Sequence, residues 1–447
     1  MRNLNRKIPN PKFQIRNIFG FRASDFVLSS FLFVSLFLVP LAVSAAQPLT
    51  YRYQHHLFFL DPDKYPEWQT VEETWVSDGV SIRPPANFRV DGDVLPELPV
   101  GIVRNVHPDW DRAAIRAAID ENIAKQIDRD PGNVVISRDD QGEIIFEGVG
   151  MVGRRVDLDN SVTLTIEAIK QGVTDIILPV EELQPQIVVD DSELRELGIK
   201  EVITVGESNF SGSPNARRHN IAVGLEQFNG ALIESGAIFS FNEILGPVNR
   251  ATGYLPELVI LGDRTLPEYG GGLCQVSTTA YRGVWEYGFP IVKRRNHSFA
   301  VRYYSPQGTD ATIYPPHSDM QFKNDSPGAI LIQTHIDGDM AYYIYYGTKD
   351  NRSSEIIGPY TWGHKNPPAD RLEYITTLPP GEERQVQGPV PGLQAMWYRV
   401  LQLPGDSEET IESYFSFYEA RPRLTQVGVV EGSNLLQNEE LRMQNEE

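Results

Sequence analysis

The chain has 447 residues, of which 41% are hydrophobic, and it carries a formal net charge of −20 at pH 7. Its length allows about two to four globular domains. The excess of acidic residues argues against a nucleic-acid partner, because binding nucleic acid needs a basic surface.

The first 46 residues have the pattern of an export signal. Six Lys and Arg residues precede an apolar run, Phe26–Val43, and the small residues Ser44-Ala45-Ala46 follow it. The run is close in length to the shortest membrane-spanning helix, so residues 1–46 are predicted to be a cleaved signal peptide or a retained N-terminal anchor. Both alternatives predict an extracytoplasmic protein, secreted or in the cell envelope, whose only membrane contact would be that anchor.

Residues 47–105 are predicted to form a small β-rich region, because short stretches such as Leu57–Leu60 and Trp75–Ile82 have strand-like patterns in a Pro-rich context. His55, His56 and His107 are interpreted as surface residues rather than metal ligands, since no suitably spaced acidic residue or cysteine accompanies them.

Residues 106–200 have the pattern of a small α+β module. Asp109 or Asp111 can cap a helix whose apolar face repeats at helical spacing: Ile115, Ala118, Ile119 and Ile123. The other elements expected are strands at 133–138 and 143–147, a helix at 161–171 that ends at Gly172, and a strand at 174–180. No catalytic set of residues occurs here, so its predicted role is binding or spacing.

Residues 201–350 are predicted to form a central domain in which a helix packs on an antiparallel sheet. The polar loop Phe210–Asn220 opens a helix expected to run to Ile233, and a second helix follows the glycines 270–272 and ends at Gly288. Strands are expected at 258–261, 291–295, 299–304, 329–335 and 341–346, with an Asp337-Gly338 hairpin turn between the last two.

The C-terminal part is rich in Pro and Gly at residues 351–428, which predicts a β-rich module, and residues 429–447 are predicted to be a disordered acidic tail. The predicted fold class is therefore α+β and multi-domain, with a central core flanked by smaller α+β and β modules.

Cys274 is the only cysteine of the chain, so it is a buried structural thiol, an intermolecular bridge or a nucleophile. Its predicted place at a helix N-terminus favours the thiolate, because unsatisfied N–H groups and the positive end of the helix dipole are concentrated there. We therefore predict a nucleophile.

A thiol nucleophile needs a base, and the base needs a group that orients it. His297 follows Cys274 by 23 residues, and Asp310 follows His297 by 13. This order resembles that of the papain-like and transglutaminase-like superfamily, which implies a papain/transglutaminase-like core. A hairpin that pairs 299–304 with 310–314 would, however, separate His297 from Asp310 by about 20 Å. Asp319, or His317, would then be the closer partner, so Asp310 and Asp319 both remain candidates.

Residues near Cys274 and His297 are candidates for binding the substrate or for stabilising an oxyanion together with the N–H of Cys274: Gly271, Gly272, Gln275, Ser277, Thr278 and Asn296. The Ser277 and Thr278 hydroxyls could equally close the first helical turn. Residues 217–219, Arg-Arg-His, form either a solvated loop or a site for a carboxylate such as a peptide C-terminus. A zinc site lacks the usual short ligand spacings, so we predict no metal and no cofactor.

Several unusual residues occur in a fixed order: Phe241-Asn242, Leu245-Gly246-Pro247, Gly253-Tyr254, Gly270–Tyr281, Asn296-His297-Ser298 and Asp310-Ala311-Thr312. Across residues 205–350 they resemble the VanW family, which is named after a vancomycin-resistance gene cluster. Residues 108–185 are similar to the peptidoglycan-binding module that commonly precedes a VanW domain, and Arg421–Gly428 is similar to the G5-type modules that often follow one. The resemblance implies an exported cell-envelope protein and leaves its reaction open.

Two hypotheses follow. In the first, the protein is a thiol enzyme that hydrolyses or transfers amide bonds of peptidoglycan peptides: Cys274 attacks, His297 carries the proton, and Asp310 or Asp319 orients the imidazole. In the second, it is a non-catalytic cell-wall binding protein whose glycine-rich groove holds a peptide or glycan.

Overall fold

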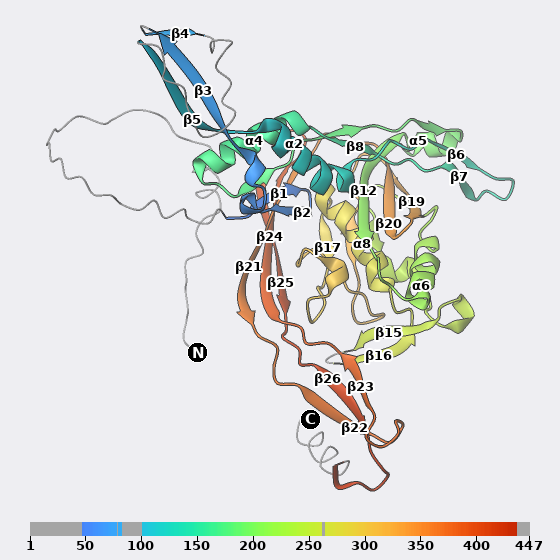
Figure 1. The fold of residues 1–447 in the computed structure, drawn as a ribbon. Helices are drawn as coiled ribbons and strands as arrows, with labels where there is room; N and C mark the ends of the chain where they lie inside the picture. The colour runs from blue at the N-terminus through green and yellow to red at the C-terminus, as the bar shows by residue number, and fades with distance from the viewer. Residues whose placement is uncertain (1–46, 78, 83–100, 262–263, 436–447) are drawn as a thin grey trace, which may run out of the picture. The chain divides into compact units, whose positions relative to one another are not determined.

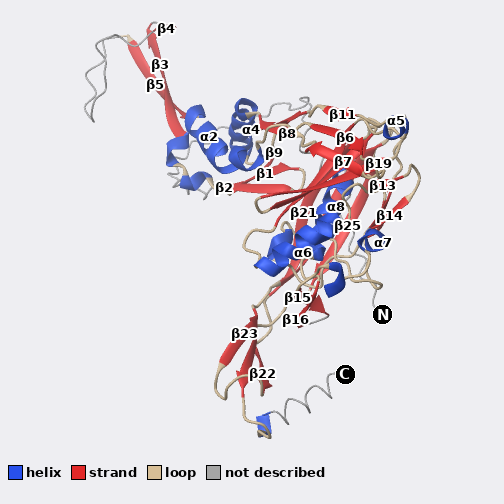
Figure 2. Cartoon of the chain, turned by 90° about the vertical axis from the view of Figure 1, so that its right-hand side faces the viewer, coloured by secondary structure: helices blue, strands red, loops and turns tan. Residues whose placement is uncertain are grey.

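The computed structural model describes residues 47–77, 79–82, 101–261 and 264–435 (Figure 1). The expected signal peptide or anchor at 1–46 lies outside these ranges, as do residues 436–447 of the expected tail. Within the described ranges, no helix combines the length and apolarity of a membrane span. Strands predominate over a few helices (Figure 2), which confirms the mixed α+β class.

The N-terminal strands form two small sheets. In one, β1 pairs with β2 in a hairpin and in parallel with β9; in the other, β3 lies between β4 and β5. Within the stretch 75–82, the end of β3 pairs antiparallel with β4, so that Trp75 lies opposite Ile82. The elements are β1 (Leu49–Tyr53), β2 (His56–Leu60), η1 (Pro62–Lys64), η2 (Pro66–Trp68), β3 (Gln69–Ser77), β4 (Val80–Ile82) and β5 (Ile102–Trp110).

The next part packs two helices on the first of these sheets. Asp111 accepts hydrogen bonds from the first N–H groups of α2, and the predicted apolar face of that helix is buried beside α4. The helix α4 ends at Gly172 in the left-handed region, as its sequence predicts. The elements are α2 (Arg112–Ile119), the π-helical turn η3 (Asp120–Ala124), α3 (Lys125–Ile127), α4 (Leu158–Gln171) and β9 (Asp175–Ile177).

A second set of strands contains the hairpin predicted at residues 133–147. β6 pairs antiparallel with β7, as expected, and parallel with β11, whereas β8 pairs with β10. The strand expected at 174–180 is split between β9 and β10. The elements are β6 (Val134–Arg138), β7 (Ile144–Gly148), β8 (Gly153–Val156), β10 (Val180–Leu183), β11 (Ile187–Val189) and α5 (Ser192–Glu196).

A four-stranded antiparallel sheet in the order β12-β20-β19-β13 carries the helix α8 (Figure 1). Its central strand β20 is buried on both faces: Tyr343 and Tyr345 lie in the core that contains α8, and Tyr342, Ile344 and Tyr346 in the core beside β6. A Cβ atom on Gly206 would lie 2.1 Å from the Thr279 oxygen, so β12 and α8 meet backbone to backbone. The elements are β12 (Glu201–Asn209), β13 (Leu232–Ile233), α8 (Leu273–Tyr287), β19 (Ile330–Asp337) and β20 (Met340–Gly347).

Smaller elements surround α8. The helix expected to reach Ile233 ends earlier, because Gly230 turns the chain and Leu232-Ile233 pair with β19 as a strand. The strand expected at 299–304 is wrong: this segment contains the short helix η5. The elements are α6 (Asn215–Glu226), β14 (Ile238–Ser240), α7 (Phe241–Leu245), η4 (Arg250–Thr252), β15 (Pro256–Leu261), β16 (Arg264–Tyr269), β17 (Ile291–Lys293), η5 (Arg302–Tyr304) and β18 (Gln321–Lys323).

The C-terminal part contains two three-stranded sheets, β21-β24-β25 and β22-β26-β23. The first sheet contacts the central part directly, since Trp397 of β24 lies in the same core as α8. The elements are β21 (Ser353–Lys365), β22 (Arg371–Ile375), β23 (Glu383–Gln387), β24 (Gly392–Gln402), β25 (Thr410–Tyr418) and β26 (Leu424–Gly428).

Candidate active site

Cys274 is the second residue of α8, where the sequence predicts it. The helix is capped by Gly272, whose φ of 117° is open to glycine but strained for other residues. The thiol is partly exposed, and its Sγ lies 3.4 Å from the Thr312 hydroxyl and 3.7 Å from the Ile313 carbonyl oxygen. Cys274 therefore places its sulfur at the first turn of α8, beside the segment that contains Thr312 and Ile313.

His297 is buried and contacts both Asp310 and Cys274. Its Nδ1 lies 2.6 Å from Asp310 Oδ2, and its backbone N–H donates to the same oxygen over 2.7 Å. With Nδ1 on the carboxylate, Nε2 is the nitrogen left for the hydrogen bond with the Cys274 thiol. The ring also stacks on Tyr304, with centroids 4.5 Å apart.

Asp310 is the acid beside His297, and the hairpin argument against it was wrong. Residues 299–314 do not form a hairpin, because η5 and the loop after it fold the chain back toward His297. The second carboxylate oxygen of Asp310 accepts hydrogen bonds from Arg294, over 3.2 Å, and from the Tyr418 hydroxyl. Arg294 and Tyr418 thus fix the carboxylate that orients the imidazole.

Asp319 and His317 lie elsewhere. Asp319 accepts hydrogen bonds at the start of α7, from the Ser240 hydroxyl over 2.7 Å and the Asn242 N–H over 2.9 Å. The ring of His317 stacks on Tyr314. Asp319 therefore has a capping role in the fold.

The charges of the three residues depend on one another. Burial raises the pKa of the Cys274 thiol, but the contacts with His297 and Thr312 outweigh burial and lower that pKa below its usual value. Burial disfavours the imidazolium of His297, whereas hydrogen bonds with Asp310 and Cys274 raise its pKa to about 9. Burial also opposes the charge of Asp310, yet His297 and Arg294 hold its pKa well below the usual range. These shifts favour a thiolate–imidazolium pair.

The other predicted binding residues hold the site together. Ser277 donates to the Ala311 carbonyl over 2.6 Å, and Thr278 accepts from the Ala311 N–H over 3.0 Å, so both hydroxyls fix the segment after Asp310. The Asn296 amide donates to the carbonyls of His297 and Phe417, and the Gly271 carbonyl accepts from Asn220. Gln275 is buried and contacts Arg217 and Ser208. At the start of α8 the N–H groups of Leu273 and Gln275 donate to the carbonyls of Gly270 and Gly272, whereas no such bond is formed by the N–H of Cys274 among the described residues.

The structure adds residues that the sequence did not single out: Tyr304, Thr312, Arg294 and Tyr418. Tyr418 follows Asp310 by 108 positions, and no motif or local pattern connects two residues so far apart. Arg294 is three positions before His297 in a run of basic residues, which by itself reads as a solvated surface. Only the folded chain reveals these contacts.

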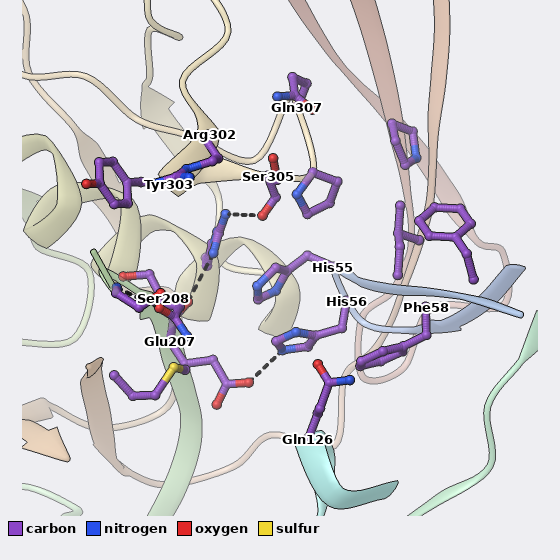
Figure 3. A pocket seen from close by; sticks show the side chains of 18 of the residues that line it. His55, His56, Phe58, Gln126, Glu207, Ser208, Arg302, Tyr303, Ser305 and Gln307 are labelled. Carbon is purple, nitrogen blue, oxygen red and sulfur yellow. Dashed lines mark hydrogen bonds and ion pairs between the residues drawn. The ribbon is translucent and has the colours of Figure 1, made fainter. Parts of the chain in front are cut away.

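A second polar cluster lies near the far end of α8 and borders a cavity of about 1090 Å³ (Figure 3). His55 is buried against Glu286, and His56 lies 2.6 Å from Glu207, so the interpretation of these histidines as surface residues is wrong for His55. Burial and the nearby Glu207 raise the pKa of Glu286 to about 8, whereas burial and His56 hold that of His55 well below its usual value. Among the described residues, no group of three or more His, Cys, Asp or Glu is arranged to hold a metal ion.

Comparison with known proteins identifies the region that contains the site. Residues 216–345 match the family described as VanW like protein. The chain is 30% identical over 188 residues to the uncharacterized protein YoaR of Bacillus subtilis, a match that covers 42% of this chain and 58% of that protein. It is 26% identical over 125 residues to the vancomycin B-type resistance protein VanW of Enterococcus faecalis, covering 27% of this chain and 45% of that protein. The chain thus spans about half the length of these curated relatives.

Two solved structures also show similarity, each over a small part of this chain. The IgA1 protease G5 domain covers 19% of it at 17% identity, with a TM-score of 0.12. The structure titled HP0197-G5 covers 17% of it at 16% identity, with a TM-score of 0.09. Similarity at this level does not define the fold of any part of the chain.

Proposed function

From the match of residues 216–345 to the family described as VanW like protein, we propose that the protein is a thiol enzyme acting on amide bonds of cell-envelope peptides, by hydrolysis or acyl transfer. The observation that carries the proposal is the contact of the Cys274 thiol with a histidine whose Nδ1 lies 2.6 Å from a buried carboxylate. A nucleophile, a base and an orienting acid in hydrogen-bond contact are what acyl transfer through a thioester requires.

Each group has one task in the reaction. The Cys274 thiolate attacks the carbonyl carbon, and the N–H of Cys274 at the start of α8 stabilises the negative oxygen that forms. The C–N bond then breaks, and the His297 imidazolium gives its proton to the leaving amine. Water, activated by the neutral imidazole, hydrolyses the thioester and releases the acid; an amine in place of water would give transfer.

The arrangement of elements supports a papain/transglutaminase-like core. The nucleophile begins α8, which packs on an antiparallel sheet, and His297 and Asp310 follow it in the chain. The VanW-like domain and the export pattern of residues 1–46 support an extracytoplasmic, cell-envelope location with cell-wall peptides as the substrate class. We propose the module boundaries given by the sequence as an organisation of the chain, although strand pairing crosses the one at residue 105.

A non-catalytic cell-wall binding protein is the second candidate, and one observation favours it. The Cys274 sulfur lies within hydrogen-bond distance of a carbonyl oxygen, that of Ile313. A neutral thiol can donate there, whereas a thiolate cannot. An inert, hydrogen-bonded thiol in a binding groove would make the same contact.

The rate of Cys274 alkylation by iodoacetamide as a function of pH separates the two candidates. We expect the folded protein to react well below pH 8, because the pKa of the thiol is lowered, with a second and smaller change near pH 9 where His297 loses its proton. His297→Ala should move the main transition above pH 8. His219→Ala, a control at an exposed histidine that hydrogen-bonds the Gly253 carbonyl, should leave the profile unchanged. A thiol that reacts only after unfolding would refute the enzyme and leave the binding protein.

A further inference from the structure

Arg217 is a buried arginine that has only neutral partners among the described residues. Its side chain belongs to α6, and 9% of the residue is exposed. The guanidinium donates to the Ser213 hydroxyl over 2.9 Å, to Gln275 Oε1 over 3.1 Å and to the Tyr304 hydroxyl over 3.4 Å. None of these groups carries a negative charge at neutral pH.

Among the described residues, several other buried arginines are paired differently. Four have a carboxylate partner: Arg154 with Glu207, Arg294 with Asp310, Arg352 with Asp350 and Arg399 with Glu412. A fifth, Arg282, donates mainly to backbone carbonyls, those of Thr309, Glu207, Tyr304 and Ser305. Burying a charge without a counter-charge is costly, so an unneutralised Arg217 points to a negative group supplied from outside the described chain.

Arg217 lies against the residues on both sides of the thiol. Gln275, one position after Cys274, accepts its hydrogen bond, and a Cβ atom on Gly272 would lie 3.1 Å from the Arg217 side chain. Tyr304 joins it to the base, because the Tyr304 ring stacks on His297 while its hydroxyl contacts the guanidinium. A group held by Arg217 would therefore be next to the reacting atoms.

We propose that Arg217 binds a carboxylate of the substrate beside Cys274, so that the protein selects peptides with a free carboxylate close to the amide bond that is attacked. A planar guanidinium matches the two oxygens of a carboxylate, and the long contact with Tyr304 is the one that an incoming oxygen can replace. The face of the guanidinium rests on the ring of Tyr303, at 4.3 Å. Tyr303 also lines the large cavity (Figure 3), which gives room for a longer ligand.

The peptide nature of this ligand rests on the proposed function, but carboxylate binding can be tested without a known substrate. Iodoacetate and iodoacetamide both form a C–S bond with a thiolate and release iodide, and only iodoacetate carries a carboxylate. Relative to a short cysteine peptide, we expect the folded protein to favour iodoacetate over iodoacetamide by roughly tenfold, because the fixed charge of Arg217 attracts it.

Arg217→Gln should abolish this preference, which is a ratio of two rates measured on the same variant and therefore does not depend on how reactive its thiol is. Arg218→Gln is the matched control: it removes the neighbouring charge, which already pairs with Asp339, and should keep the preference. Arg302→Gln, which removes the exposed cation beside Tyr303, should also keep it. An equal preference in the folded wild type and in Arg217→Gln would overturn the inference.

Competition on the wild-type protein covers the case in which Arg217→Gln does not fold. Blocked dipeptides with a free C-terminal carboxylate should slow iodoacetamide alkylation of Cys274, and their C-terminal amides should not. A third series, amidated but with a glutamate side chain, distinguishes a side-chain carboxylate from a terminal one. Protection by all three series alike would refute carboxylate recognition. The enzyme itself would be refuted by a different result, a pH profile of Cys274 alkylation that is the same in His297→Ala as in the wild type.

Discussion

Asp310 is the residue on which the proposed chemistry most depends, because it holds the Nδ1 and the backbone N–H of His297 at once. Asp310→Asn keeps the shape of the side chain and removes its charge. The hydrogen bond with Asp310 is the first of the contacts that raise the pKa of His297, so we expect that pKa to fall. The alkylation transition of Cys274 should then move to higher pH, and any peptide turnover should fall by roughly 10²-fold or more.

Asp319→Asn provides the matched control for Asp310→Asn. Asp319 caps α7 and contacts neither Cys274 nor His297. Asp319→Asn should therefore lower the free energy of unfolding by about 1 kcal/mol and leave the pH dependence of Cys274 alkylation unchanged. A profile that shifts with Asp319→Asn but not with Asp310→Asn would contradict the assignment.

The two acids also show how far residue order carries a site prediction. The order of residues in the chain identified Cys274, His297 and Asp310 as candidates, because a thiol, an imidazole and a carboxylate suit the roles of nucleophile, base and orienting acid. It could not choose between Asp310 and Asp319, since that choice depends on where the backbone turns. Phe299–Tyr304 has the composition of a strand, yet its last three residues form η5 and Tyr304 stacks on His297. Tertiary packing overrode local propensity there.

At the scale of elements, the contact between α8 and β12 is closer than their sequences suggest. A Cβ atom on Gly283 would lie 2.6 Å from the backbone nitrogen of Gly206. Alanine is normally favoured over glycine inside a helix by about 1 kcal/mol. At this position we expect Gly283→Ala instead to destabilise the protein by about 2 kcal/mol, because α8 must move away from the sheet. Urea denaturation measures the change.

Gly224→Ala in α6 is the comparison for that variant. Its new methyl group would meet the tip of the Leu273 side chain, which can rotate, rather than backbone. Its effect should therefore be smaller than that of Gly283→Ala. An equal or larger loss of stability in Gly224→Ala would show that close backbone approach is not what makes Gly283 necessary.

Elements with a strong local pattern were predicted well: the helix that became α8, the hairpin β19–β20 and the hairpin β6–β7. Prediction failed where a short segment takes its structure from a distant partner. Leu232-Ile233 extends a helical pattern in the sequence but pairs with Leu331 and Ile330 across the sheet. Likewise, β1 pairs with β9, which is more than one hundred positions away. The residues of such strands carry no local sequence pattern that predicts the distant strand with which they pair.

At the scale of the whole molecule, residues beyond the VanW-like match complete both the core and the site. The match ends at residue 345, but Trp397 packs edge-on against Trp285 of α8, with centroids 5.6 Å apart. Arg399 donates to the carbonyls of Trp285 and Phe289, and so satisfies oxygens at the end of α8. The Tyr418 hydroxyl accepts from the Gly308 N–H and donates to Asp310.

We therefore predict that a chain truncated after residue 350 cannot form the site, whereas a chain truncated after residue 428 can. Removing β24 and β25 exposes the core around Trp285 and leaves the carboxylate of Asp310 without the Tyr418 hydroxyl, and either change costs about 1–3 kcal/mol or more. The shorter chain should unfold at a lower temperature than the longer one, and its Cys274 should react as an ordinary thiol. In the full-length protein, Tyr418→Phe removes only the hydrogen bonds of the Tyr418 hydroxyl and should lower the free energy of unfolding. The control is Tyr343→Phe, which removes a buried hydroxyl that has no partner among the described residues and should leave the free energy of unfolding unchanged. If the chain truncated after residue 350 keeps the cooperative unfolding and the His297-dependent alkylation of the full chain, the site forms without the C-terminal sheet, and that sheet only rests against it.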